Sequence, residues 1–180
     1  MSDTKNLTTA ELTPPLSDDI IAGLAVGQMV YLSGTIYTAR DAAHKRMVEM
    51  LQSGEAAPFP FAGEVVFYAG PCPSPPGHVI GSIGPTTSGR MDAYSPFLIR
   101  RELKVMIGKG LRSPDVVEAI RECGGVYFAA IGGAAAQMSR CVKEATVVAF
   151  DDLGTEAIRR LTVERLPLIV AIDASGNCIY

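Results

Sequence analysis

The amino-acid sequence predicts an α/β fold with a largely buried central sheet. Stretches rich in β-branched and aromatic residues, in part with period two, alternate along the chain with apolar residues at helical spacing. The 180 residues favour one domain, and 48% hydrophobic residues against 19% charged residues provide enough apolar material for a core. A turn followed by a short strand at the C-terminal end predicts a closing hairpin, so some strands should be antiparallel.

The elements of the N-terminal half follow in order. Residues 1–17 are polar and contain Pro14-Pro15, which predicts an extended arm before a single domain over residues 18–180. Thr38 or Asp41 is the expected cap of the long helix in this half. The expected elements are a helical turn over 18–24, a strand over 27–37, a helix over 41–52, a strand over 64–70, a Pro-rich loop over 71–77 and a strand over 78–84.

In the C-terminal half the alternation continues. Ser113 is the expected N-cap of a helix that has Pro114 at its first position and ends at Gly124. The other expected elements are a helix over 94–103, strands over 105–108 and 126–131, a helix over 134–141, a further element over 145–150, a helix near 156–161, a strand over 168–173, a turn over 173–177 and a last strand over 178–180.

Composition excludes several classes of function. The net charge of −3 and pI of about 5.4 give no basic excess for nucleic acid. No apolar run reaches about 18 residues, so no membrane-spanning helix is expected. The first residues are polar and lack the apolar region of a secretory signal. The default expectation is a soluble cytoplasmic protein.

The cysteines and histidines do not predict a metal site on this chain. The four cysteines, at positions 72, 123, 141 and 178, form no C-x-x-C pair, and the chain has only two histidines, His44 and His78. The four cysteines are expected to be ordinary buried or partly buried thiols. The alternative, an iron–sulfur cluster held by these cysteines, has no supporting spacing.

Residues 84–92 are the most informative segment. They combine three hydroxyls, on Thr86, Thr87 and Ser88, with Arg90 and a carboxylate in a glycine-flanked stretch. Glycine lets the backbone approach a ligand closely, and arginine can bind a small anion with two parallel hydrogen bonds. A helix start capped by Thr87 or Ser88 is the simpler alternative, although it leaves the glycines and Arg90 unexplained.

Two other basic segments support an anion site. Arg40 lies at a strand-to-helix junction, where free N–H groups bind anions, unless Arg40 pairs with Asp41 or another surface acid. Lys109 lies between two glycines after a strand, which is also consistent with a plain turn. A small-residue loop over 132–136 is a further candidate for close backbone approach, although helix packing explains it equally well.

Each of the three basic segments follows a predicted strand. In α/β sheets, ligands collect at the carboxyl ends of strands. Three cations at three such ends therefore predict a small molecule with two negative charges.

With these residues identified, the chain resembles the C-terminal domain of class I iron–sulfur fumarases. It is equally similar to the separate β subunits of two-subunit fumarate hydratases and L(+)-tartrate dehydratases. The resemblance runs from about Leu16 to Tyr180. The matching motifs occupy residues 34–45, 68–73, 84–92, 107–110, 132–135 and 172–177.

The resemblance implies a swivelling β/β/α domain with a central, mostly parallel sheet and flanking helices. It implies a hydro-lyase that hydrates fumarate to (S)-malate, with Thr86 as the catalytic base and Arg40, Arg90 and Lys109 binding the dicarboxylate. It also implies a [4Fe–4S] cluster on a partner α subunit, not on this chain, where its open iron would bind the departing hydroxyl. The expected assembly is α2β2, with a homodimer as the alternative for the isolated chain.

The implied roles agree with elementary chemistry. Removing a proton from the carbon beside a carboxylate builds negative charge that Arg and Lys stabilise most in the transition state. Nearby Arg90 and Lys109 would favour the alkoxide of Thr86. Two alternatives stay open: an L(+)-tartrate dehydratase β subunit, and a dicarboxylate-binding module that has lost catalysis, although mere binding would not need Thr86.

Overall fold

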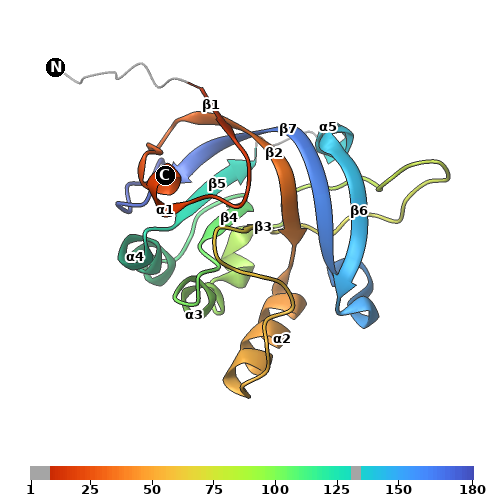
Figure 1. The fold of residues 1–180 in the computed structure, drawn as a ribbon, viewed down its shortest axis with the longest axis horizontal. Helices are drawn as coiled ribbons and strands as arrows, with labels where there is room; N and C mark the ends of the chain where they lie inside the picture. Colours follow the sequence, from red (N-terminus) through yellow and green to blue (C-terminus); the bar gives the residue numbers. More distant parts are fainter. Residues whose placement is uncertain (1–8, 131–134) are drawn as a thin grey trace.

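A computed structural model describes residues 9–130 and 135–180, which form a closed, barrel-like sheet with helices packed on its outside (Figure 1). The strands of these ranges are β1 (Ala10–Leu12), β2 (Met29–Thr38), β3 (Val65–Phe67), β4 (Val105–Gly108), β5 (Val126–Ala130), β6 (Val142–Ala149) and β7 (Ile158–Ile172). The helices are α1 (Asp18–Ala22), α2 (Asp41–Gln52), α3 (Ser95–Ile99), α4 (Pro114–Cys123) and α5 (Ala135–Cys141), with 3-10 helices η1 (Ser88–Met91) and η2 (Asp151–Glu156).

The sheet closes because β7 pairs with both ends of a parallel array. Strands β2, β3, β4 and β5 are parallel neighbours, and β7 runs antiparallel to both β2 and β5. Strands β1 and β6 add to this ring from outside, β1 parallel to β2 and β6 antiparallel to β7. The fold is therefore α/β as predicted, but the expected mostly parallel sheet with flanking helices is a mixed, closed sheet instead.

Strand β7 is the main correction to the predicted elements. A helix was expected near residues 156–161, but residues 158–172 form one long strand. The N-terminal part of this strand is paired on both sides, with β2 and with β6. Neither partner is close in the sequence, so local periodicity around Arg159 and Arg160 did not indicate the strand.

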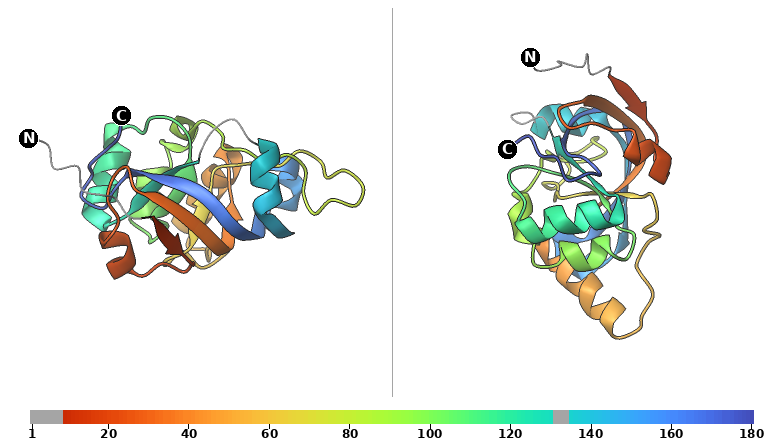
Figure 2. Two further views of the ribbon diagram at one scale, coloured as in Figure 1. Left: turned by 90° about the horizontal axis from the view of Figure 1, so that it is seen from above. Right: turned by 90° about the vertical axis from the view of Figure 1, so that its left-hand side faces the viewer.

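The strand expected over residues 78–84 is also wrong. In the structure residues 69–87 form a long excursion from the end of β3, closed by an isolated bridge between Ala69 and Pro85. Four prolines at positions 71, 73, 75 and 76 remove backbone donors, which disfavours ladder pairing in this excursion. The segment instead projects from the body of the protein, as the left view of Figure 2 shows.

Local signals predicted the other helices, although α3 ends at Ile99 and not at residue 103 as expected. Ser113 accepts a hydrogen bond from the Val116 backbone N–H (3.4 Å), and Gly124 adopts the left-handed conformation (φ 64°) that ends α4. The bounds of α2 are as predicted, but its N-cap is Arg40, and neither Thr38 nor Asp41 caps it. The Thr38 hydroxyl instead accepts from the Arg159 backbone N–H (3.1 Å).

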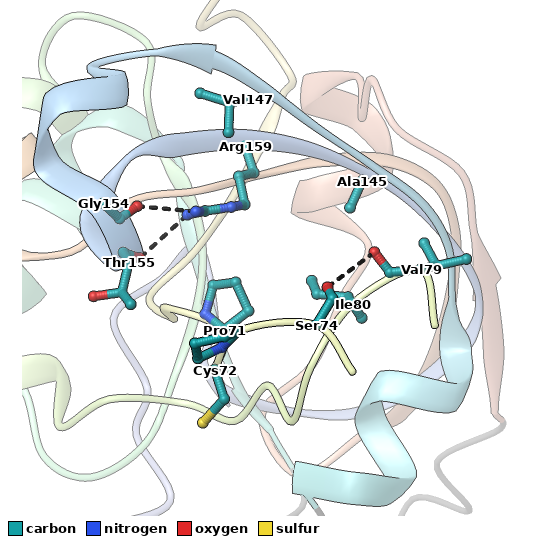
Figure 3. Close-up of a pocket in the computed structure, with 11 residues that line it drawn as sticks. Pro71, Cys72, Ser74, Val79, Ile80, Ala145, Val147, Gly154, Thr155 and Arg159 are labelled. Carbon is teal, nitrogen blue, oxygen red and sulfur yellow. Dashed lines mark hydrogen bonds between the residues drawn. The ribbon is translucent and has the colours of Figure 1, made fainter. Parts of the chain in front are cut away.

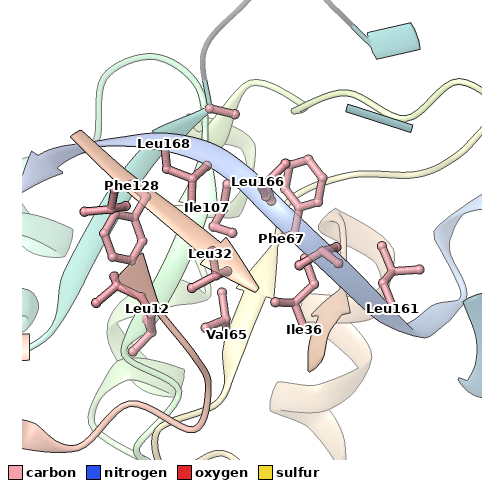
Figure 4. Close-up of a cluster of buried hydrophobic side chains, with 14 of the residues drawn as sticks. Leu12, Leu32, Ile36, Val65, Phe67, Ile107, Phe128, Leu161, Leu166 and Leu168 are labelled. Atoms are coloured by element: carbon pink, nitrogen blue, oxygen red, sulfur yellow. The ribbon is translucent and has the colours of Figure 1, made fainter. Parts of the chain in front are cut away.

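The core has two parts, one on each face of the sheet. Val65, Phe67 and Ile107 point into the barrel interior with Phe128 and Leu168 (Figure 4). The alternate residues of the same strands pack outward under α2, α3 and α4. This alternation is the expected property of a small barrel, whose interior is filled by side chains.

Part of the predicted N-terminal arm belongs to the folded domain. Residues 10–12 of the predicted arm form β1, and Leu12 and Leu16 are buried. Cys123 and Cys141 are partly buried, as predicted, but Cys72 and Cys178 are exposed. Most of the small-residue loop over 132–136 lies outside the described residues. Within the described ranges, no helix is long and apolar enough to cross a membrane.

Candidate functional site

The predicted site residues gather at the carboxyl ends of three adjacent parallel strands. Arg40 follows β2, which ends at Thr38, and Lys109 directly follows β4. Thr86 lies where the long excursion returns to the end of β3. Because β2, β3 and β4 are parallel neighbours, these ends share one edge of the sheet, as ligand sites in α/β proteins do.

Backbone hydrogen bonds fix Thr86 beside the end of β3. The Thr86 N–H donates to the Tyr68 carbonyl (2.7 Å), and the Tyr68 N–H donates to the Ile107 carbonyl of β4 (2.8 Å). The adjacent Pro85 bridges to Ala69. The Thr86 backbone is therefore tied into the sheet although it belongs to a loop, and its side chain is only half-buried.

Lys109 is attached to the same loop. Thr87 forms a parallel bridge with Lys109, whose carbonyl accepts from the Ser88 N–H (3.0 Å). The Lys109 N–H in turn donates to the Ser88 hydroxyl (3.0 Å). Its side chain is exposed, and the ion-paired lysines of the described residues are Lys45, Lys104 and Lys143. The ammonium of Lys109 is thus left for a ligand.

The helix-cap alternative for residues 84–92 is wrong. The 3-10 helix η1 begins at Ser88, but Thr87 at its N-cap makes no side-chain capping bond. The Ser88 hydroxyl is directed to Lys109 and to the Tyr127 hydroxyl (2.8 Å) instead. The Ser88 hydroxyl therefore has a use other than starting a helix.

Asp41 brings the two arginines together. Arg90 Nη2 lies 2.7 Å from Asp41 Oδ2, and Arg40 Nε lies 3.8 Å from Asp41 Oδ1. Arg40 Nε and Asp41 Oδ1 are both buried without a hydrogen-bond partner, so this pair is close but not bonded. Burial raises the pKa of Asp41, but its own backbone N–H and Arg90 outweigh that effect, and the pKa is lowered.

Glu156 is a site residue that the sequence did not reveal. One carboxylate oxygen lies 3.2 Å from Arg40 Nη2, and the other accepts a hydrogen bond from the Ala42 N–H at the start of α2 (3.0 Å). Glu156 thus replaces the missing side-chain cap of α2 and holds Arg40 at the same time. The predicted alternative for Arg40, pairing with Asp41 or a nearby surface acid, is therefore present.

The two arginines, Arg40 and Arg90, and the loops of Thr86 and Lys109 come together at residues 68–70. A Cβ added at Gly70 would lie 3.3 Å from Arg40 Nη1 and 2.7 Å from the Thr155 carbonyl. The Arg40 guanidinium therefore lies against the backbone just beyond Ala69, which bridges to Pro85. Glycine at position 70 permits this close approach.

His44 lies beneath Arg40 as a neutral, buried imidazole. Its Nδ1 lies 2.8 Å from the Arg40 carbonyl, so Nδ1 carries the proton and donates. Burial lowers the pKa of His44 to about 4. Its ring packs edge-on against Tyr68, with centroids 5.1 Å apart. His44 therefore supports the backbone at the start of α2 and does not add a charge to the site.

A second buried group, Arg112, supports residues 84–92 from below. Its side chain is 0% exposed and donates from Nε to Asp92 Oδ1 (2.7 Å) and from Nη2 to the Ser95 hydroxyl (2.8 Å). The other oxygen of Asp92 accepts from the Ser113 N–H (2.6 Å). The carboxylate noted in the sequence motif thus anchors the segment to the buried arginine.

A cavity of about 410 Å³ adjoins this edge at Pro71 and Thr155, between the Pro-rich loop and the β6–β7 hairpin (Figure 3). Its lining includes Cys72, Val79, Val147 and Arg159. Arg159 donates to the carbonyls of three residues, which are Gly154, Thr155 and Ala157. Because those carbonyls engage both of its terminal nitrogens, this cavity is a weaker anion site than the edge that carries Arg40, Arg90 and Lys109.

The described residues do not provide a metal-ligand set. Within residues 9–130 and 135–180, no three His, Cys, Asp or Glu side chains are grouped closely enough to hold a metal ion. The four cysteines come from separate elements of the fold. The described residues therefore offer no ligand set for an iron–sulfur cluster.

Comparison with known proteins gives a consistent family. The family described as Fumarase C-terminus matches residues 2–180. Fumarate hydratase 2 of Leishmania major is 40% identical over 157 residues, covering 86% of this chain and 28% of that protein. Fumarate hydratase class I, aerobic, of Escherichia coli K12 is 37% identical over 175 residues, covering 94% of this chain and 32% of that protein.

A third relative has a different length. A Methanocaldococcus jannaschii protein, provisionally named L(+)-tartrate dehydratase subunit beta, is 43% identical over 163 residues. That match covers 87% of this chain and 84% of the archaeal protein. The chain thus spans about a third or less of the fumarate hydratases but most of a separate subunit.

Proposed function

The chain belongs to the Fumarase C-terminus family, and from this premise we propose that it is the β subunit of a hydro-lyase that reversibly hydrates fumarate to (S)-malate. The observation that carries the proposal is the convergence of Arg40, Arg90 and Lys109 with Thr86 at the carboxyl ends of β2, β3 and β4. Three cations and a threonine hydroxyl at one edge of the sheet suit a dicarboxylate whose reacting carbon lies beside a carboxylate.

Each residue has a defined part in the proposed reaction. Arg40 and Arg90 bind substrate carboxylate, and the bound carboxylate competes with Asp41 for Arg90, whose side chain is 51% exposed. Thr86 removes the proton from the carbon beside a carboxylate when malate is dehydrated, and returns it in hydration. Charge that builds on that carboxylate is stabilised by Arg and Lys more in the transition state than in the ground state.

The hydroxyl of Thr86 needs help to act as a base. A threonine alkoxide is unfavourable in water, and nearby positive charge lowers the pKa of a hydroxyl by stabilising its anion. Arg90 and Lys109 supply that charge in the proposal. The Thr86 N–H is bonded to the Tyr68 carbonyl, which fixes the Thr86 backbone. Positioning the hydroxyl for reaction therefore costs little conformational entropy.

The proposal requires a partner chain. The family resemblance implies a [4Fe–4S] cluster, and this chain lacks a ligand set for it among its described residues. We therefore assign the cluster to an α subunit, with α2β2 as the proposed assembly in the cytoplasm. The archaeal relative supports a partner, because its name describes a subunit beta of nearly the same length.

L(+)-tartrate dehydration is the second candidate. It is favoured by the same archaeal relative, which is matched along 84% of its length. Tartrate differs from malate by a second hydroxyl, so the same carboxylate clamp and base would serve. A dicarboxylate-binding module without catalysis would have no need of the Thr86 hydroxyl.

Turnover of the reconstituted complex tests the proposal. The chain is co-expressed anaerobically with the α subunit of the same organism, and the complex is assayed with fumarate, malate and L(+)-tartrate side by side. We expect kcat/KM to be highest for fumarate and malate. A clear preference for tartrate would establish the second candidate, and binding of dicarboxylates without any turnover would favour the non-catalytic module.

A further inference from the structure

Ser88 and Tyr127 form a buried connection between the Thr86 loop and the Lys109 loop. Both side chains are 0% exposed at the residue level, and their hydroxyl oxygens lie 2.8 Å apart. The Tyr127 hydroxyl donates to the Gly110 carbonyl (3.0 Å), so the Ser88 hydroxyl must donate to Tyr127. Ser88 then accepts from the Lys109 N–H (3.0 Å).

This connection holds the backbone of Lys109 on both sides. The Ser88 hydroxyl binds the N–H of Lys109, and the Ser88 N–H donates to the Lys109 carbonyl (3.0 Å). Tyr127, on β5, reaches the next residue, Gly110. Ser88 itself follows Thr86 by two residues, so the proposed base and the proposed cation are fixed to one another through a short path.

Gly108 shows how closely the two loops fit. A Cβ added at Gly108 would lie only 1.9 Å from the Ser88 Oγ, so any larger residue would push Ser88 away. The glycine before Lys109 therefore gives room for the serine hydroxyl. This requirement accounts for one glycine of the G-K-G motif without involving a ligand.

We propose that Ser88 and Tyr127 are positioning residues that set the Lys109 ammonium relative to the Thr86 hydroxyl. The inference rests on the proposed function, because it concerns the geometry of the same site. Two features of the network favour it over simple filling of the core. Its hydrogen bonds end on backbone atoms of Lys109 and Gly110, and the serine does not cap the helix that it begins.

The substitutions Ser88→Ala and Tyr127→Phe each remove a hydroxyl and leave the packed side chain otherwise in place. Tyr37→Phe is the matched control, because Tyr37 is also a buried β-strand tyrosine but is outside this network. A misplacement of about 1 Å can lower a rate by on the order of 100-fold. We expect kcat/KM of the complex to fall about 10- to 100-fold for Ser88→Ala, mainly through kcat, and to stay unchanged for Tyr37→Phe.

A second readout does not depend on activity. The Lys109 amide proton is bonded to the Ser88 hydroxyl, so its exchange with solvent deuterium in the intact chain reports the connection directly. We expect faster exchange at Lys109 in Ser88→Ala and Tyr127→Phe, and the wild-type rate in Tyr37→Phe. The melting temperature of each variant identifies any general loss of stability, which would speed exchange throughout the core and not at Lys109 alone.

The two readouts separate this inference from the proposed function. Faster exchange confined to the Lys109 loop, together with the loss of kcat, supports the positioning role. Unchanged exchange at Lys109 overturns it whatever the activity, and so does faster exchange with unchanged kcat. A wild-type complex that turns over none of the substrates would count against the proposed function, while the exchange rates would still decide whether Ser88 and Tyr127 hold Lys109.

Discussion

The buried pair of Arg112 and Asp92 gives a prediction with a magnitude. The Arg112 side chain is 0% exposed and that of Asp92 is 12% exposed, with 2.7 Å between Arg112 Nε and Asp92 Oδ1. Asp92→Ala would leave a buried guanidinium without its carboxylate, and also remove the acceptor of the Ser113 N–H. Breaking a buried pair in this way costs about 3–5 kcal/mol.

That free energy converts to a large thermal shift. In a domain of this size each kcal/mol lowers Tm by roughly 2–4 °C, so Asp92→Ala should lower Tm by about 6–20 °C. The assay is thermal unfolding of the chain followed by circular dichroism, with urea unfolding to check the free energy. Replacing the arginine as well, in Asp92→Ala with Arg112→Met, should recover part of the loss because no buried charge remains.

A surface pair provides the matched control. Arg100 and Glu122 are also 2.7 Å apart, but their side chains are 48% and 46% exposed. Exposed pairs contribute little, so Glu122→Ala should leave Tm nearly unchanged. If Asp92→Ala shifts Tm no more than Glu122→Ala does, the argument that burial makes the Arg112 pair important is wrong.

Two further predictions concern α2. The pKa of His44 is lowered to about 4 from 6.5, so unfolding takes up a proton between these values, and roughly 3 kcal/mol of stability should be lost as the pH falls from about 6.5 to 4. Urea unfolding across this pH range should show the loss of stability. The substitution His44→Gln should remove most of this pH dependence, whereas His78→Gln, at an exposed position, should leave it in place. A pH dependence that survives His44→Gln would refute the assignment to His44. Glu156→Gln should loosen Arg40, raising KM for the dicarboxylate several-fold with a smaller change in kcat, in steady-state assays of the complex. An unchanged KM would mean that Glu156 only caps the helix.

The sequence indicated those features of the fold that depend on neighbouring residues. Ser113, Pro114 and Gly124 mark the ends of α4 because capping is local. Closure of the sheet was not predicted, because it depends on β7 pairing with β2 and β5, which lie far away in the chain. The Pro-rich excursion was assigned a strand at residues 78–84 from composition alone, without a partner strand to pair with it.

The candidate site shows the same difference between features that depend on neighbouring residues and features that depend on distant ones. Arg40 and Lys109 could be placed at strand ends because Arg40 comes two residues after β2 and Lys109 directly after β4. Their roles in catalysis stay predictions. Glu156 could not be found, since it reaches Ala42 across 114 positions of sequence. In the sequence Tyr127 looks like any other strand residue. Only the folded chain shows that its hydroxyl donates to the Gly110 carbonyl, next to Lys109.

The central claim is that Thr86 is the base of a two-chain hydro-lyase, and one comparison tests it most directly. The turnover of malate and fumarate is measured in complexes that carry Thr86→Ala or Thr87→Ala, with substrate affinity measured alongside. Thr87 is the adjacent, more exposed threonine and serves as the control. The account predicts that Thr86→Ala abolishes kcat with a modest loss of affinity, while Thr87→Ala retains turnover. Near-normal turnover of Thr86→Ala would contradict it.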